Sequence, residues 1–195
     1  MKLDIILSGV GGQGILSIAT IIGEACLREG LHIKQAEVHG MSQRGGDVQS
    51  NLRISSEPIY SDLIALSSAD AIISLEPMEA LRYIPYLSEE GWIVTNSSPF
   101  VNIPNYPEMD DILSELNSLP NVILLDVDKI AKEAGAGRSA NMALLGAASV
   151  ILGIDPAKLE EAIIKVFLGK GERIVEMNIK AFRGGRSMGE SQIEK

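Results

Sequence analysis

The fold is decided near the N-terminus, by the stretch Leu3-Asp4-Ile5-Ile6-Leu7-Ser8-Gly9-Val10-Gly11-Gly12-Gln13-Gly14. Its first five residues form a mostly apolar run, which predicts a strand buried inside a parallel sheet. After the glycines, apolar residues recur at the spacing of one helix face, at Ile15, Ile18, Ala19, Ile22 and Cys26. A buried strand, a glycine-rich turn and a helix in succession are typical of the start of an α/β domain.

The rest of the chain repeats this alternation. Further strands are predicted at residues 32–38, 48–54, 70–75, 91–96 and 121–126. Helices are predicted near residues 61–66, 77–83, 110–119, 128–134, 139–152, 155–168 and 172–182. This order predicts an α/β fold, a three-layer Rossmann-like domain with a mostly parallel sheet. We expect one domain over residues 1–182, and a flexible C-terminal tail over residues 183–195, where small and polar residues gather.

Composition narrows the classes of function. The 195 residues are 46% hydrophobic but only 4% aromatic, so the core must be aliphatic. A net charge of −9 argues against nucleic-acid binding, although a local cradle of backbone N–H groups can still hold a phosphate. No apolar run is long enough to span a membrane, and the N-terminus enters a strand instead of a signal peptide. We therefore expect a cytoplasmic protein without a membrane partner.

Cys26 is the only cysteine. The chain can form no internal disulfide, which suits a reducing compartment. It cannot by itself supply the four thiolates that usually hold an iron–sulfur cluster. The spacing of Cys26, His32 and His39 fits no zinc site, so no metal site is expected. On its helix face Cys26 is expected to pack in the core.

The glycine-rich turn is the first candidate binding site. Glycines let the chain turn tightly beside a phosphate, and the following helix N-terminus offers free N–H groups. Glu37 lies 23 residues after Gly14, near the place of a ribose-binding acid, so the pattern alone favours NAD or FAD. The alternative is that the glycines only allow close packing of strand and helix. The candidate residues are Gly9, Gly11, Gly12, Gln13 and Gly14.

Residues 39–46 form a second candidate. His39, Gln43 and Arg44 bring an imidazole, an amide and a guanidinium into one flexible loop, which suits an anionic ligand or another subunit. The alternative is a solvated loop. The loops at residues 9–14, 39–46, 76–78 and 96–100 each follow a predicted strand, so they are expected to converge on one cleft.

Three single residues lie near these loops. Glu76 could bind a ligand group, or it could cap the helix that follows it. Asn141 could reach the cleft or satisfy loop carbonyls, and Arg138 is the best-placed cation of that region.

Four strings occur together in this chain. They are Gly9-Val10-Gly11-Gly12-Gln13-Gly14-Ile15-Leu16, Glu37-Val38-His39-Gly40-Met41-Ser42-Gln43-Arg44-Gly45-Gly46, Leu75-Glu76-Pro77-Met78-Glu79-Ala80 and Asn141-Met142-Ala143-Leu144-Leu145-Gly146. In this order they resemble the gamma-type domain of 2-oxoacid:ferredoxin oxidoreductases, and most of all its indolepyruvate branch. The resemblance covers residues 1–180.

The resemblance implies a subunit that is inactive alone. The complex would oxidise a 2-oxoacid, an aryl pyruvate in the indolepyruvate branch, with coenzyme A to acyl-coenzyme A, CO2 and reduced ferredoxin. Thiamine diphosphate and iron–sulfur clusters would sit in a larger partner subunit, so ferredoxin would be an indirect partner. This chain would contribute coenzyme A binding and subunit contacts, with no catalytic residue of its own.

The resemblance also gives the phosphate cradle a different ligand, the diphosphate of coenzyme A. The expected cleft residues are then the turn at residues 9–14 together with His39, Gln43 and Arg44. Two other hypotheses remain open here: a free-standing NAD- or FAD-dependent oxidoreductase, and a purely structural assembly subunit. A chain shaped for a partner can also dimerise when isolated.

Overall fold

The N-terminal apolar run lies in the middle of a six-stranded sheet. The strands are β1 (Lys2–Val10), β2 (His32–His39), β3 (Asp47–Ser55), β4 (Ala69–Ser74), β5 (Leu87–Asn96) and β6 (Val122–Leu125). In this computed structural model, which describes residues 1–39 and 45–194, their order is β2-β3-β1-β4-β5-β6. Strands β1, β4, β5 and β6 pair in parallel, whereas β3 pairs antiparallel with both β1 and β2. The sheet is therefore mostly parallel, as predicted.

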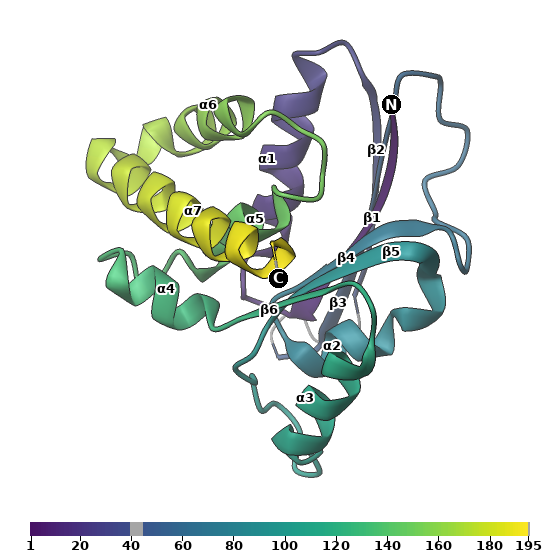
Figure 1. Cartoon of the computed structure of the whole chain (residues 1–195). Coiled ribbons are helices and arrows are strands. Elements are labelled where there is room, and N and C mark those ends of the chain that lie inside the picture. The colour runs from purple at the N-terminus through teal and green to yellow at the C-terminus, as the bar shows by residue number, and fades with distance from the viewer. Residues whose placement is uncertain (40–44, 195) are drawn as a thin grey trace.

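Helices cover both faces of the sheet, so the expected three-layer α/β architecture is confirmed (Figure 1). The α-helices are α1 (Ile15–Leu27), α2 (Pro77–Arg82), α3 (Met109–Ser118), α4 (Val127–Glu133), α5 (Ala140–Ala148), α6 (Pro156–Phe167) and α7 (Glu172–Ile193). Short 3-10 turns are η1 (Ile84–Tyr86) and η2 (Leu168–Lys170). Figure 1 shows α1 and α4 to α7 on one face, with α2 and α3 on the other.

Strand β1 illustrates why the chain buries two cores. Successive side chains of a strand point to opposite faces of the sheet. Ile5 and Leu7 accordingly pack into the larger core with α1 and α5, whereas Ile6 packs into the smaller core with α2 and α3. All three are 0% exposed, and burying such a side chain contributes roughly 1.5–3 kcal/mol.

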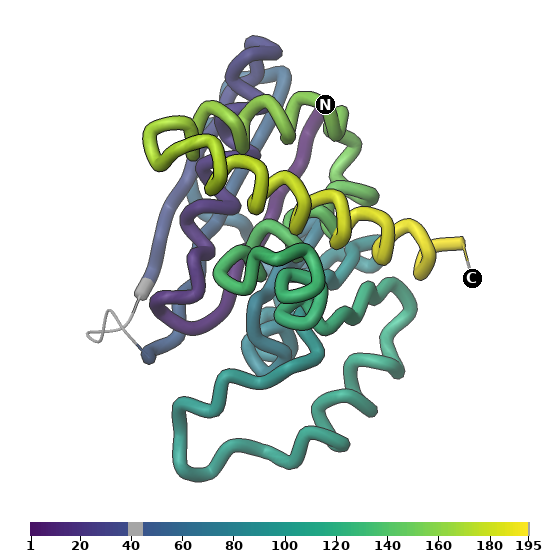
Figure 2. The backbone as a smooth tube through the Cα atoms, turned by 90° about the vertical axis from the view of Figure 1, so that its left-hand side faces the viewer, coloured from purple at the N-terminus to yellow at the C-terminus, as the bar shows by residue number. Residues whose placement is uncertain are grey.

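The C-terminal helix α7 is longer than the sequence predicted. The prediction of a flexible tail at residues 183–195 is wrong for residues 183–193, which continue α7 and cross α5 (Figure 2). A Cβ on Gly185 would lie 1.8 Å from the carbonyl oxygen of Ala143, and a Cβ on Gly189 would lie 2.9 Å from the carbonyl oxygen of Ala147. The small residues that indicate a loose tail are therefore the residues that let two helix backbones touch.

The segment between β3 and β4 also differs from its prediction. A helix was expected near residues 61–66, but the segment is irregular. Arg53 on β3 donates to the carbonyl oxygens of Ser61 and Leu63, both at 3.2 Å, and Ile64 N donates to Asn51 Oδ1 at 3.1 Å. These bonds from the sheet fix the backbone without a helix. Within the described part of the chain, no helix has both the length and the apolar character needed to cross a bilayer.

Candidate functional site

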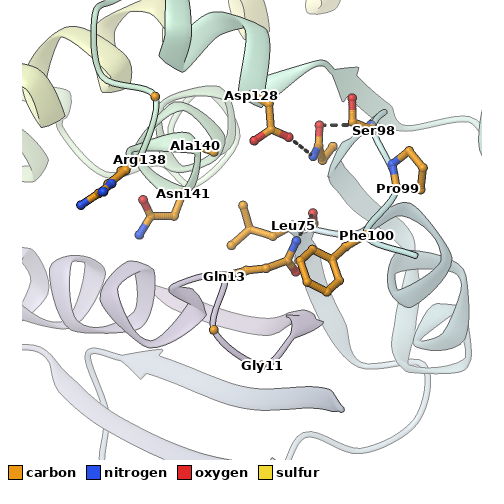
Figure 3. A pocket seen from close by; sticks show the side chains of 13 residues that line it. Gly11, Gln13, Leu75, Ser98, Pro99, Phe100, Asp128, Arg138, Ala140 and Asn141 are labelled. Carbon is orange, nitrogen blue, oxygen red and sulfur yellow. Dashed lines mark hydrogen bonds between the residues drawn. The ribbon is translucent and has the colours of Figure 1, made fainter. Parts of the chain in front are cut away.

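A cavity of about 370 Å³ opens at the carboxyl ends of the parallel strands, where ligands bind in open α/β sheets (Figure 3). The glycine-rich turn after β1, Leu75 after β4 and the loop after β5 form part of its lining. The start of α4 and the residues that lead into α5 complete it. The cavity is lined by Gly11, Gly12, Gln13, Leu75, Asn96, Ser98, Pro99, Phe100, Asp128, Gly137, Arg138, Ala140 and Asn141.

Gln13 fixes the glycine-rich turn against the neighbouring strand. Its Oε1 accepts a hydrogen bond from Val10 N at 2.7 Å, and its Nε2 donates to the Leu75 carbonyl at 3.2 Å. Gly9 lies beneath this side chain, because a Cβ there would come within 2.8 Å of Gln13 Oε1. Gly9 therefore serves packing, whereas Gln13 both supports the turn and lines the cavity.

Gly12 and Gly14, on either side of Gln13, have different surroundings. Gly12 has a φ of +103°, and a Cβ there would meet no atom within 4 Å, so its backbone is open to the cavity. Gly14 precedes α1 with a φ of +89°, and a Cβ there would lie 2.7 Å from Asn141 Nδ2. Asn141 Nδ2 donates to the Gly14 carbonyl at 3.2 Å and also lines the cavity. Both alternatives considered for Asn141 therefore hold.

The cavity wall formed by the segments after β5 and β6 contains a carboxylate, Asp128, which is held by a hydrogen bond. Asn96 is buried, and its Nδ2 donates to Asp128 Oδ2 at 3.0 Å, while its Oδ1 accepts from Ser98 N and Val127 N, both at 3.2 Å. Figure 3 shows Asp128 directed toward the cavity from the start of α4. Asp128 was not among the residues predicted to line the site. Its position directly after a predicted strand was the signal that could have found it.

A cationic side chain, Arg138, and an aromatic ring, Phe100, lie on opposite walls of the cavity. Figure 3 places Arg138 across the cavity from Phe100, with its guanidinium directed outward at the rim, and Phe100 is 46% exposed. Among the residues that the structure describes, Arg138 takes part in no salt bridge. A guanidinium in this state can meet a phosphate, and an exposed ring can stack on a planar base.

The second predicted loop is only partly described. His39 is the last residue of β2 and pairs with Val48, while Gln43 and Arg44 lie outside the described residues. The described end of the loop touches the turn, since Gly11 N donates to the Gly46 carbonyl at 2.8 Å. The structure thus brings Gly11, Gly12 and Gln13 together on one cavity and places the second loop's end beside them.

Glu37 does not have the neighbour that a dinucleotide site requires. In the dinucleotide fold the ribose-binding acid ends the strand next to β1. Here β3 intervenes, because Glu37 pairs with Ser50, and Ser50 pairs with Leu7. Glu37 instead borders a separate hollow of about 240 Å³ beside Gly11 and Leu16. The strand order therefore does not favour the NAD or FAD hypothesis.

Comparisons with known proteins give one consistent result. Residues 4–188 match the family model described as pyruvate ferredoxin/flavodoxin oxidoreductase. The chain is 36% identical over 192 residues to the indolepyruvate oxidoreductase subunit IorB of Methanothermobacter thermautotrophicus, covering 95% of this chain and 96% of that protein.

Solved structures agree. One is a 2-oxoglutarate:ferredoxin oxidoreductase from Magnetococcus marinus with 2-oxoglutarate, coenzyme A and succinyl-CoA bound. It is 25% identical with a TM-score of 0.76, and the match covers 97% of this chain but 31% of that longer chain. A keto/oxoacid ferredoxin oxidoreductase gamma subunit from Geobacter sulfurreducens shares the fold at 24% identity and a TM-score of 0.71, over 97% and 99% of the two chains.

Proposed function

We propose a role for this chain from the premise that it belongs to the pyruvate ferredoxin/flavodoxin oxidoreductase family. It is the small subunit of a 2-oxoacid:ferredoxin oxidoreductase, and it works with larger partner subunits. We propose that these partners hold thiamine diphosphate and iron–sulfur clusters and that the 2-oxoacid is an aryl pyruvate such as indolepyruvate. The proposed substrate is supported by the name of a relative, the indolepyruvate oxidoreductase subunit IorB, because the match covers nearly the whole length of both proteins.

The proposed contribution of this chain is to bind coenzyme A for the acyl-transfer step. In that reaction the acyl group left after decarboxylation passes to the thiol of coenzyme A, and the released electrons pass to ferredoxin. The observation that carries the proposal is the cavity at the strand ends, with open backbone at Gly12, a ring at Phe100 and a guanidinium at Arg138 that forms no salt bridge with any described residue. Coenzyme A offers a diphosphate, a further phosphate and an adenine to such groups.

The charge of the whole chain does not oppose this proposal. A net charge of −9 repels anions at long range, but the charges nearest to a bound phosphate are those of the cavity lining, where Arg138 would attract it and Asp128 would repel it. The phosphate is therefore expected on the Arg138 side, beside the open backbone of Gly12. Coenzyme A is larger than a cavity of about 370 Å³, so the cavity would hold one end of it and a partner subunit the remainder. We also propose that the complex is cytoplasmic, where a lone buried thiol stays reduced.

Two experiments test this function. Anoxic purification of the native protein should yield a larger subunit with thiamine diphosphate and iron–sulfur absorption. In that complex, Arg138→Ala should raise KM for coenzyme A about tenfold, because one charged phosphate contact is lost. Arg173→Ala removes another exposed arginine, at the start of α7, and should leave that KM unchanged. A normal KM in Arg138→Ala would contradict the proposed site.

A further inference from the structure

The loop after β5, residues 97–108, forms one wall of the cavity without any secondary structure of its own. Ser98, Pro99 and Phe100 line the cavity, and the loop contains neither helix nor strand. Pro99, Pro104 and Pro107 lack a backbone N–H. Ser97 N donates to the Leu125 carbonyl at 2.8 Å, and Tyr106 packs against the smaller core, but the loop joins no strand ladder. Side-chain hydrogen bonds therefore contribute to fixing where this wall lies.

A buried carboxylate supplies those hydrogen bonds. Glu76 lies between β4 and α2 and is 0% exposed. Its Oε1 accepts hydrogen bonds from the Tyr106 hydroxyl and, at 3.4 Å, from Phe100 N, so it contacts the loop at two points. Its Oε2 accepts from Glu79 N at 2.8 Å and thereby caps α2. Burial, and then the bond to Glu76, raises the pKa of Tyr106, so its hydroxyl remains a donor.

The same loop is also tied to the glycine-rich turn. Asn102 Nδ2 donates to the Gly45 carbonyl at 2.8 Å, and Gly45 N donates to the Gly11 carbonyl at 3.3 Å. The loop is thus attached to Glu76 on its inner side and to the turn at the rim. A shift of the loop would move Phe100 relative to Gly11 and Gln13 across the cavity.

We propose that Glu76 is a positioning residue, which sets the width of the cavity by holding the Phe100 wall. The inference rests on the proposed function, in which this cavity holds part of coenzyme A. Helix capping alone does not account for the hydrogen bonds that the Glu76 carboxylate accepts. The cap occupies Oε2 and serves a helix of only six residues, whereas Oε1 is directed to a loop that lies 24 and 30 positions later in the chain.

The test uses the assembled complex and two variants of this contact. Tyr106→Phe removes only the hydroxyl that donates to Glu76, and Glu76→Gln keeps the shape but removes the charge. Each should raise KM for coenzyme A about fivefold, which is the effect of weakening one hydrogen bond to a charged group. The value of kcat and KM for the 2-oxoacid should change little, while the melting temperature should fall by a few degrees because a buried oxygen loses a partner. A purely structural role would not separate these quantities.

Glu79→Gln is the matched control. Glu79 lies on the same helix and is 1% exposed, but its carboxylate binds Arg82 instead of the loop. It should leave KM for coenzyme A unchanged. An equal rise in this control, or an unchanged KM in both Glu76→Gln and Tyr106→Phe, would overturn the positioning role. If Glu76→Gln fails to assemble, Tyr106→Phe decides alone.

The outcome also separates this inference from the function on which it rests. If Arg138→Ala raises KM for coenzyme A while Tyr106→Phe and Glu76→Gln do not, only the positioning role is wrong. If none of the three variants alters that KM, the cavity is not the coenzyme A site and both proposals are wrong.

Discussion

The crossing of α5 and α7 offers a quantitative test through the substitution Gly185→Ala. An added Cβ would lie 1.8 Å from the carbonyl oxygen of Ala143 and 2.6 Å from its carbonyl carbon. These are backbone atoms, so no side-chain rotation relieves the overlap and the helices must move apart. Overpacking of this kind costs about 1–3 kcal/mol, and the severity of the overlap favours the upper end.

Part of that cost is offset, because alanine favours a helix over glycine by up to about 1 kcal/mol. The expected net loss in the free energy of unfolding is therefore about 2 kcal/mol. For a chain of this length that corresponds to a fall in melting temperature of about 4–8 °C.

Urea denaturation of the purified chain, followed by circular dichroism and by the fluorescence of the single Trp92, measures this loss. Gly23→Ala is the control, since Gly23 lies inside α1 and a Cβ there meets no atom within 4 Å. It should stabilise the chain by up to about 1 kcal/mol. If Gly185→Ala is as stable as Gly23→Ala, the C-terminal half of α7 does not pack on α5.

Three further outcomes are expected. Cys26 is 1% exposed, and burial raises the pKa of its thiol to about 11, so iodoacetamide should label this thiol only when the chain unfolds. Rapid labelling of the folded chain would show that the thiol is accessible. Burial, opposed by Arg82, raises the pKa of Glu79, so the folded state holds the proton of this carboxyl more tightly than the unfolded state does. Relative to Glu79→Gln, the wild-type free energy of unfolding should therefore fall as the pH rises above about 4.5. A difference between the two proteins that stays constant with pH would refute this. The Asp4 side chain is 2% exposed and binds Arg53 through both carboxylate oxygens. Asp4→Ala should lower the free energy of unfolding by about 2–3 kcal/mol, which is less than for a fully buried pair because the Arg53 side chain is 20% exposed. A loss below about 1 kcal/mol in urea denaturation would show that the pair contributes little to stability.

Local sequence predicted the start of the fold well. The apolar run, the glycines and the helical spacing of residues 3–26 each depend on neighbours in the chain, and the structure has a strand, a turn and a helix there. The rule that sites lie at the carboxyl ends of parallel strands also predicted that four loops converge on one cleft. Those at residues 9–14 and 96–100 line the cavity, residues 76–78 do not, and most of residues 39–46 lies outside the described residues.

Features set by distant residues could not be predicted. Nothing in the local pattern of residues 48–54 shows that β3 lies between β1 and β2, yet this order separates Glu37 from β1. The composition of residues 183–193 indicates a loose tail, and only the partner helix α5 reveals why glycines are needed there. Likewise, the cap formed by Glu76 is visible in sequence, but its bond to Tyr106 is not.

Reconstitution of the enzyme tests whether this chain supports coenzyme A-dependent oxidation of a 2-oxoacid. This chain and its larger partner would be purified separately under anoxic conditions, and ferredoxin reduction by an aryl pyruvate would be measured with and without coenzyme A. We expect little reduction with either protein alone, and coenzyme A-dependent reduction when the two are mixed. Full activity of the partner without this chain, or reduction by this chain alone with a bound nicotinamide or flavin, would contradict it.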